Sequence, residues 1–386
     1  MKPGRDSIGT AEELHAEARE ITGLDGFGAD DYREGLAVLL ESYARDAALT
    51  PWGNRINQAL LRGALVARQL SEAAAQQYPG HASVAIERPI VVTGLPRTGT
   101  TALHRLLCAD PGHQGLEMWL TEAPQPRPPR ATWEDNPAFE RIQERCRNHN
   151  VANPEFMGVH YLAADMVEEC WQLLRQSMMS IGYETLAHLP TYSRWLAQQD
   201  WTPAYRRHRQ NLQVIGLRDA GRRWVLKNPS HLFALPALMA VYPDALVVQT
   251  HRDPADVIAS VSSLAAQATD GQSDVFQGEV IGRIHLELWA RGAERFMLDR
   301  KQYDPAQFID VRYDTFTSDP IGTVETIYGH FGLLLSESAR SAMVALHAES
   351  RADDRKPSHR YELSDFGLSV DEVNERFARY RNGYLQ

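Results

Sequence analysis

One stretch of the 386-residue chain decides its fold, Pro89-Ile-Val-Val-Thr-Gly-Leu-Pro-Arg-Thr-Gly-Thr-Thr-Ala-Leu-His-Arg-Leu-Leu107. The apolar run Ile90–Val92 predicts a short buried strand, and the periodic apolar residues after the loop predict a helix. Gly94 and Gly99 lie in the connection between them. This order is the setting of a phosphate-binding loop, because the first N–H groups and the dipole of a helix attract an anion.

The loop differs from the usual loop of ATP and GTP enzymes in the place of its cation. The pattern GxxxxGK[ST] requires a lysine directly after the second glycine, and this chain has Thr100 there. Its cation comes earlier, as Arg97. The lysine that would reach a β- or γ-phosphate is therefore missing. Arg97 and the hydroxyls of Thr98, Thr100 and Thr101 still suit a phosphate group.

A second strand–turn–helix pattern follows at Asp244-Ala-Leu-Val-Val-Gln-Thr-His-Arg-Asp-Pro-Ala-Asp-Val-Ile-Ala-Ser260. The run Ala245–Val248 predicts the strand. Asp253 is a favourable N-cap, and Pro254 is a favourable first helical residue. Two such units in an alternating α/β pattern indicate a parallel sheet, with a ligand at the carboxyl ends of its strands.

Two side chains of this second pattern can share one anion. Ser260 comes about two helical turns after the cap, so it lies on the same face as the start of the helix. We therefore expect Arg252 and Ser260 to converge at the carboxyl edge of the sheet. The alternative is that Arg252 pairs with Asp253 or Asp256 at the surface.

Together these patterns resemble sulfotransferases that use 3′-phosphoadenosine 5′-phosphosulfate (PAPS). The Arg97 loop resembles the family's 5′-phosphosulfate loop, where cytosolic members carry lysine and protein-tyrosine sulfotransferases and many bacterial relatives carry arginine. Arg252 and Ser260 resemble the family's 3′-phosphate motif. The resemblance implies a P-loop-like parallel sheet flanked by helices. On the 5′ side of the donor it implies contacts from Arg97, Thr98, Gly99, Thr100 and Thr101.

Looser matches extend the resemblance over about residues 85 to 385. Trp224-Val-Leu-Lys-Asn-Pro-Ser-His231 resembles the family's strand that ends in a lysine at the sulfuryl group, here Lys227. Phe308–Phe316 resembles the strand that ends in a tyrosine at adenine, here Tyr313. A basic loop over the nucleotide corresponds to Arg355–Tyr361, although a solvated loop explains it almost as well. The candidates for the 3′-phosphate in that loop are Arg355, Lys356, Ser358 and His359.

The implied reaction moves a sulfuryl group in line from a phosphate to an acceptor hydroxyl. Arg97 and Lys227 would neutralise the leaving 5′-phosphate, assisted by backbone N–H groups from Gly99 to Thr101. Two side-chain cations leave no need for a metal, and the sequence shows no cluster of metal ligands. PAPS is therefore the expected cosubstrate, PAP its product, and no metal is expected.

A general base must also accept the hydroxyl proton. Glu117 is the first candidate. It stands twenty residues after Arg97, within a residue of the offset that protein-tyrosine sulfotransferases use. His231 is second, because cytosolic relatives place a histidine close after the equivalent lysine, and His160 is third. Glu117 as a surface carboxylate and His231 as a helix cap are the structural alternatives.

Composition limits the partners and the location. The net charge of −10 disfavours a general polyanion binder, so nucleic acid is not an expected partner. Three scattered cysteines form neither a disulfide framework nor a zinc motif. We find no apolar run near the roughly 18 residues of a membrane span and no signal-peptide core at the N-terminus. These features predict a cytoplasmic protein.

The chain divides into a helical N-terminal arm, residues 1–84, and an α/β domain, residues 85–386. Within the domain, residues from about 111 to 215 break the βα rhythm and predict a helical cap over the donor. Large apolar and aromatic side chains in the cap favour an acceptor with an apolar or aromatic body. We expect the arm to pack on the core or on a partner chain, where it would be a dimer element of a homodimer.

Three hypotheses follow for the function. The first is a PAPS-dependent sulfotransferase that acts on a hydroxyl of a small lipophilic or aromatic molecule. The second is an atypical P-loop kinase, which would need magnesium and a lysine near the phosphates. The third is a non-catalytic protein that binds PAP or another nucleotide without turnover. A 3′-phosphate pocket serves no purpose for ATP, so Arg252 and Ser260 speak against the kinase.

Overall fold

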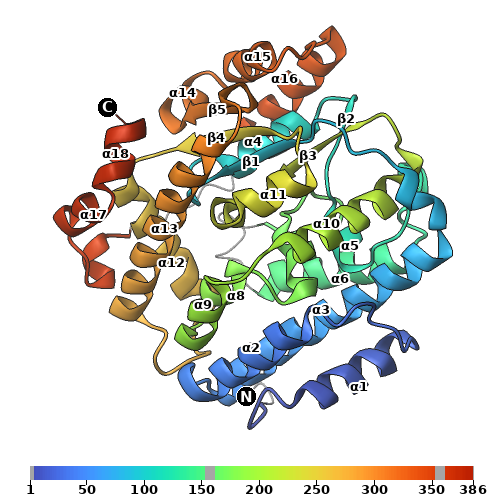
Figure 1. The fold of residues 1–386 in the computed structure, drawn as a ribbon, viewed down its shortest axis with the longest axis vertical. Coiled ribbons are helices and arrows are strands. Elements are labelled where there is room, and N and C mark those ends of the chain that lie inside the picture. Colours follow the sequence, from blue (N-terminus) through green and yellow to red (C-terminus); the bar gives the residue numbers. More distant parts are fainter. Residues whose placement is uncertain (1–3, 153–160, 353–360, 386) are drawn as a thin grey trace.

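The structure is a computed structural model that describes residues 4–152, 161–352 and 361–385. Its centre is a five-stranded sheet with the order β2-β3-β1-β4-β5 and all neighbours parallel (Figure 1). The predicted α/β class with a parallel sheet is confirmed. His160 and the basic loop with Arg355, Lys356, Ser358 and His359 lie outside the described residues. The strands are β1 (Ile90–Gly94), β2 (His113–Gln114), β3 (Arg223–Lys227), β4 (Leu246–His251) and β5 (Phe308–Arg312).

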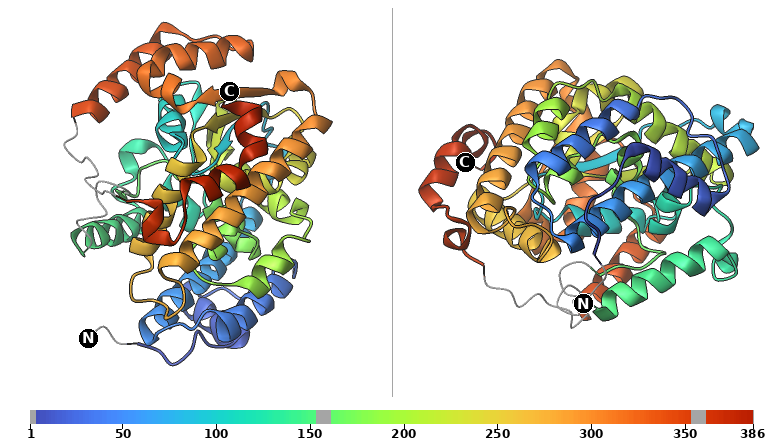
Figure 2. Two further views of the ribbon diagram at one scale, coloured as in Figure 1. Left: turned by 90° about the vertical axis from the view of Figure 1, so that its left-hand side faces the viewer. Right: turned by 90° about the horizontal axis from the view of Figure 1, so that it is seen from below.

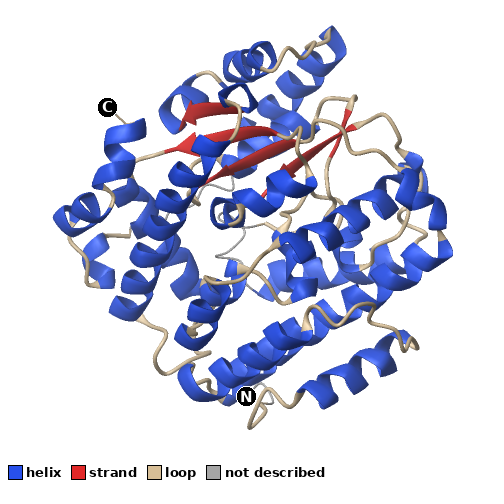
Figure 3. Ribbon diagram, in the orientation of Figure 1, coloured by secondary structure: helices blue, strands red, loops and turns tan. Residues whose placement is uncertain are grey.

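Helices surround this sheet, and they make up most of the chain (Figures 2 and 3). In chain order they are α1 (Ala11–Thr22), α2 (Arg33–Asp46), α3 (Pro51–Gln77), α4 (Thr100–Cys108), α5 (Met118–Glu122), α6 (Pro137–Ala152), α7 (Trp171–Leu174), α8 (Ile181–Glu184), α9 (Pro190–Leu196), α10 (Thr202–Ile215), α11 (Leu235–Val241), α12 (Pro254–Ala268), α13 (Gly278–Asp299), α14 (Tyr313–Ser318), α15 (Pro320–His330), α16 (Glu337–Ala352), α17 (Val370–Arg376) and α18 (Ala378–Tyr384). Short 3₁₀ turns connect several of them, among them η4 (Arg175–Ser177) and η6 (Pro229–Phe233).

The sheet lies between two helical layers, because side chains alternate across a strand. Ile90 and Val92 of β1 belong to the smaller apolar cluster, which includes buried residues of α4, α14, α15 and α16. Val91 faces the other way, into the large cluster with α10, α11, α12 and α13. Both faces of β1 and β4 are buried, which explains why each of these strands begins with a continuous apolar run.

The register of the sheet brings the strand ends together. Val92 of β1 pairs with Lys227 of β3, and Gly94 pairs with Thr250 of β4. Since all strands are parallel, their carboxyl ends lie along one edge. The loop after β1, the end of β3 and the residues after β4 and β5 therefore meet there.

The N-terminal arm packs against the cap. Its main helix, α3, is capped by Thr50, whose hydroxyl accepts from the Gly53 N–H at 3.0 Å, and Pro51 is its first residue. The helical pattern predicted for residues 1–84 is present in the structure as α1, α2 and α3. α3 contacts α5, η4 and α10, and α2 contacts α9, at the lower side of Figure 1.

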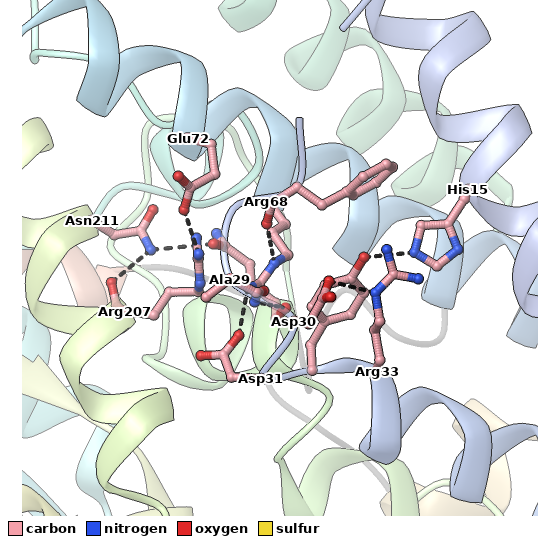
Figure 4. A network of polar contacts seen from close by, with 12 residues as sticks. His15, Ala29, Asp30, Asp31, Arg33, Arg68, Glu72, Arg207 and Asn211 are labelled. Carbon is pink, nitrogen blue, oxygen red and sulfur yellow. Dashed lines mark hydrogen bonds and ion pairs between the residues drawn. The ribbon is translucent and has the colours of Figure 1, made fainter. Parts of the chain in front are cut away.

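A buried cation ties the arm to the cap (Figure 4). Arg68 of α3 is 0% exposed and lies over the ring of Tyr32 at 4.1 Å. It donates to the carbonyl oxygens of Phe27 at 2.6 Å and Gln176 at 3.0 Å, and it pairs with Asp31. A buried guanidinium needs such partners, because its donors would otherwise be unsatisfied. The arm thus packs on the chain itself, and a division at residue 84 stays a prediction.

Candidate active site

The loop after β1 depends on two glycines. Gly94 has φ +141°, and a Cβ there would lie 2.5 Å from the Thr250 carbonyl oxygen. Gly99 has φ +85° and caps α4, with the rings of Tyr313 and Phe316 beside it. Both positions therefore require glycine. Thr98 closes the loop, since its hydroxyl donates to the Leu95 carbonyl oxygen at 2.6 Å.

The start of α4 has no side-chain cap. Gly99 provides no side-chain cap, so the N–H groups at the first turn, at Thr100 and Thr101, make no side-chain capping bond. Arg97 has φ +64°, which is uncommon for a residue with a side chain. The strained arginine and the uncapped helix start thus belong to one short loop.

The two sequence patterns meet at this loop. The Arg97 Nε donates to the Ser260 hydroxyl at 3.1 Å. The Arg252 Nη1 donates to the Arg97 carbonyl oxygen at 3.1 Å, and the Arg252 guanidinium lies 4.5 Å from the centre of the Tyr313 ring. Burial lowers the pKa of Arg97; Tyr361 raises it and Arg252 lowers it further. Two neighbouring cations of this kind suit an anionic ligand.

The alternative that Arg252 pairs with Asp253 or Asp256 at the surface is true only for Asp256. Arg252 also pairs with Asp256 at 3.4 Å, and Asp256 is exposed. Asp253 has other partners: it accepts from the Ala255 N–H at 2.9 Å, as predicted for an N-cap, and it pairs with Arg381 of α18 at 2.6 Å. Arg252 therefore reaches both the loop and the surface.

Lys227 lies at the same edge and meets a residue that the sequence did not single out. It is 2% exposed, and its Nζ donates to the Thr101 hydroxyl at 3.2 Å. Its second contact is an ion pair with Glu169. The segment that carries Glu169 is fixed on both sides, because Glu168 N–H donates to Leu116 at 2.7 Å and Cys170 N–H donates to the Lys227 carbonyl oxygen at 3.0 Å.

Glu168 precedes Glu169 and is partly buried. Burial and the neighbouring Glu169 raise the pKa of Glu168 to about 7. The consecutive acids were visible in the sequence, but no motif connects them to a lysine 58 residues later. The contact arises only when the cap folds onto β3.

Glu117 has a different partner. It precedes α5, and its carboxylate accepts from the Arg127 Nε at 3.0 Å. Arg127 also pairs with Asp219 at 2.5 Å. Burial raises the pKa of Glu117, and Arg127 lowers it. Glu117 is therefore not a surface carboxylate, because it is largely buried. Its role as the general base stays a prediction.

His231 lies inside η6 and is almost fully buried. Its Nδ1 is 2.6 Å from the Tyr205 hydroxyl, and its Nε2 forms no hydrogen bond with any described residue. Burial holds the pKa of this ring well below its usual value. The capping role that we considered for His231 belongs to Asn228, whose side chain accepts from the Ser230 N–H at 3.0 Å.

A mostly apolar cavity of about 210 Å³ adjoins the loop. Pro96 of the loop and Glu169 line it, and a smaller cavity of about 20 Å³ is lined by Thr101, Lys227 and again Glu169. Glu169 is thus in the wall of both. The remaining lining residues of the larger cavity are Trp171, Ile181, Gly182, Thr185, Leu186, Asn228, Pro229, Ser230, Val261, Leu264, Ala265, Ala268, His285 and Trp289.

Two further observations concern metals and membranes. Over residues 4–152, 161–352 and 361–385, we find no group of three or more His, Cys, Asp or Glu side chains arranged to hold a metal ion. In the same part of the chain, each helix is too short or too polar to span a bilayer.

The fold and the site define a P-loop-like α/β protein in which Arg97, Lys227 and Arg252 lie at the carboxyl edge of the parallel sheet. The family model described as "Sulfotransferase family" matches residues 89–337, and the chain belongs to this family. The crystal structure of sulfotransferase STF1 from Mycobacterium tuberculosis H37Rv is 57% identical and has a TM-score of 0.91, covering 97% of this chain and 100% of that one. Sulfotransferase STF9 from Mycobacterium avium is 27% identical with a TM-score of 0.88, covering 98% and 97%.

A curated relative carries a substrate in its name. Omega-hydroxy-beta-dihydromenaquinone-9 sulfotransferase Stf3 from Mycobacterium bovis is 27% identical over 261 residues, which are 65% of this chain and 64% of the relative. The match therefore spans a little under two thirds of that protein.

Proposed function

We propose that the protein transfers a sulfuryl group from PAPS to the hydroxyl of a small lipophilic or aromatic acceptor. One observation carries the proposal: Arg97, Lys227 and Arg252 gather at one sheet edge beside an apolar cavity. The edge suits a donor with phosphates at two positions, and the cavity suits an apolar acceptor. Membership of the sulfotransferase family and the lipophilic substrate in the name of Stf3 support it.

Different residues would bind the two ends of PAPS. Arg252 and Ser260 would hold the 3′-phosphate, with Tyr313 at the adenine. Arg97 and the start of α4, with Gly99, Thr100 and Thr101, would hold the 5′ side. Arg97 also donates to Ser260, so the two ends are coupled through one hydrogen bond. The Thr98 hydroxyl bonds to the Leu95 carbonyl oxygen, so Thr98 would contribute to the site by holding the loop backbone in place.

Catalysis would rest on charge and position. The acceptor oxygen forms a bond to sulfur while the bond from sulfur to the 5′-phosphate oxygen breaks, and the electron pair stays on that phosphate. Lys227 and Arg97 stabilise the charge that develops there. The acceptor proton must move to a base within hydrogen-bond reach of the hydroxyl.

We favour Glu169 as this base over the candidates from the sequence. Glu169 lines the apolar cavity and pairs with Lys227, so its carboxylate lies between the cavity and a cation of the donor site. Glu117 points to Arg127 and lines neither of the two cavities described above, and His231 is enclosed beside Tyr205.

Isothermal titration with PAP, ADP and ATP, with and without magnesium, tests the donor site. We expect metal-independent PAP binding that exceeds ADP binding at least tenfold, because only PAP carries a 3′-phosphate. Magnesium-dependent ATP binding with no preference for PAP would favour the kinase. PAP binding without turnover of PAPS by any acceptor would favour the non-catalytic protein.

The base is tested by comparing Glu169→Gln with Glu117→Gln. Loss of a general base lowers the rate about 10²–10⁴-fold, so Glu169→Gln should lower kcat by at least about 100-fold. Titration with PAP serves as the control that the donor site is intact. A loss of kcat in Glu117→Gln alone would return the base to Glu117.

A further inference from the structure

Both chain neighbours of Arg252 contact the last helix of the protein. Arg252 stands between His251, the last residue of β4, and Asp253, which caps α12. The side chains of both neighbours bond to residues of α18, which lies beside the end of β4 (Figure 1). The residue proposed for the 3′-phosphate thus lies in a short segment that a helix from the other end of the domain holds at two points.

The first of these points is the His251 ring, which is 1% exposed and has a partner at each nitrogen. Its Nε2 lies 2.9 Å from Asp310 Oδ1, and its Nδ1 lies 3.0 Å from the Tyr380 hydroxyl. Asp310 also pairs with Arg300 at 2.7 Å, so its ionised carboxylate can only accept a hydrogen bond. Nε2 therefore carries a proton and donates it to Asp310.

The other nitrogen of His251 then accepts from α18. Burial lowers the pKa of His251, so the ring is neutral and has a single N–H, at Nε2. Nδ1 must accept, and the Tyr380 hydroxyl must donate. The ring of Tyr384, one helical turn further along α18, stacks on the His251 ring with 4.1 Å between the ring centres. Two tyrosines of one helix thus hold this ring in position and orientation.

The second point is the Asp253 carboxylate. Its Oδ1 accepts from the Ala255 N–H at 2.9 Å, which is the cap of α12, and its Oδ2 accepts from the Arg381 Nη1 at 2.6 Å. An ion pair at the surface adds little stability by itself. Here it fixes the residue directly after Arg252, while Tyr380, the neighbour of Arg381 in α18, fixes the residue directly before it.

The direction of the Arg252 guanidinium depends on the backbone between these two points. A guanidinium is a planar fork, so its bonds to a phosphate need a defined direction as well as a charge. Arg252 lies 4.5 Å from the centre of the Tyr313 ring and donates to the Arg97 carbonyl oxygen. A shift of the backbone at either neighbour would turn the fork away from this place.

We propose that α18 is a positioning element of the donor site: through His251 and Asp253, its residues Tyr380, Arg381 and Tyr384 direct the Arg252 guanidinium at the 3′-phosphate of PAP. The inference rests on the proposed assignment of Arg252 to that phosphate. Coupling between two places in a protein is reciprocal, so bound PAP must in turn stabilise α18. A nucleotide without a 3′-phosphate has no such effect.

The test compares PAP with adenosine 5′-monophosphate (AMP), which lacks only the 3′-phosphate, by isothermal titration. Tyr380→Phe removes a hydroxyl without changing the charge, and Tyr380→Phe/Tyr384→Leu also removes the stacked ring. The Kd of PAP should rise about threefold in the single variant and about tenfold in the double variant. The Kd of AMP should change less than about twofold. Arg379→Ala, an exposed position of the same helix, is the matched control and should leave both constants as in wild type.

The ratio of the two constants separates positioning from folding. Equal rises for PAP and AMP in the double variant, or no rise in either, would overturn the inference, because α18 would then serve only the fold. In an Arg252→Ala background, Tyr380→Phe should have no further effect on PAP, since it acts through the missing guanidinium. A further rise there, as large as in wild type, would also contradict the inference.

If the variants do not fold, hydrogen exchange tests the wild-type protein. At matched saturation, PAP should slow exchange of the backbone amides of residues 378–384 at least about threefold more than AMP does, and equal protection would contradict the inference. Wild-type protein that binds PAP no more tightly than AMP would instead contradict the proposed 3′-phosphate site itself.

Discussion

Arg252 shows how much one side chain can connect. It follows β4, donates to the backbone of Arg97, lies over Tyr313 and pairs with Asp256. Arg252→Ala should raise the dissociation constant of PAP by about 10- to 100-fold, because a charge-assisted hydrogen bond is worth about 1.5–3 kcal/mol. Titration calorimetry measures it. Asp256→Ala is the matched control, since it removes the surface pair and leaves the guanidinium; PAP affinity that drops only in this control would refute the 3′-phosphate assignment.

Lys227 should act on the rate more than on affinity. Its charge matters most as the bond to the leaving phosphate breaks, so Lys227→Ala should lower kcat by about 100-fold or more. Steady-state kinetics with PAPS, with PAP titration alongside, separates the two effects. A rise in KM for PAPS at unchanged kcat would mean that Lys227 only binds the donor.

The sequence predicted residues that follow strands and missed those that depend on tertiary contacts. Arg97 and Arg252 each lie within a few residues of the end of an apolar run, so a parallel sheet was enough to bring them together. Glu169 reaches Lys227 only through the folded cap. The contacts of α18 with His251 and Asp253 likewise join segments far apart in the chain, so no local pattern indicated them.

At the scale of elements, the start of α3 packs closely against the loop after α12, the helix that carries Ser260. A Cβ on Gly53 would lie 1.9 Å from the Gln272 carbonyl oxygen, and nothing lies within 4 Å of a Cβ on Gly63. Gly53→Ala should therefore lower the free energy of unfolding by about 1–3 kcal/mol. Gly63→Ala in the same helix should raise it by about 0.5–1 kcal/mol. Urea unfolding measures the free energy of unfolding of both variants. Equal changes in the two variants would show that helix propensity, and not close packing at Gly53, determines the effect.

The elements themselves were predictable in kind but not in extent. Apolar periodicity indicated the β1–α4 and β4–α12 units, which the structure confirms. The segment from about 111 to 215 contains helices, as predicted, and its role as a cap stays a prediction. The two-residue strand β2 was not predicted, because a segment this short has no periodicity of its own. It exists because its residues pair with Arg223 and Trp224 of β3.

At the scale of the whole molecule, the larger apolar cluster joins the arm, the predicted cap and one face of the sheet. Several histidines are enclosed within the protein, among them His104, His208 and His285. Protonation of these buried histidines at low pH therefore favours the unfolded chain, where water can solvate their charge.

These histidines predict how stability depends on pH. Burial lowers the pKa of His104 and His208 to about 3 and that of His285 to about 4. Below pH 6.5 these histidines are protonated in the unfolded chain but stay neutral in the folded protein. The free energy of unfolding therefore decreases as the pH falls from 6.5 toward 4. At pH 5 each histidine accounts for about 2 kcal/mol. Glu168, with a pKa of about 7, has the opposite sign: its contribution is lost as the pH rises from 4.5 through 7.

The slope of unfolding free energy against pH isolates one histidine from the rest. His208→Phe should reduce this slope between pH 6 and 4.5 by about one proton, or about 1.4 kcal/mol per pH unit, whatever it does to stability at pH 7. The exposed His330→Gln is the control and should leave the slope as in wild type. Denaturant titrations at a series of pH values give the slopes. If His208→Phe retains the full slope, His208 must take up a proton within the folded protein, and its enclosure beside Tyr242 must open before the chain unfolds.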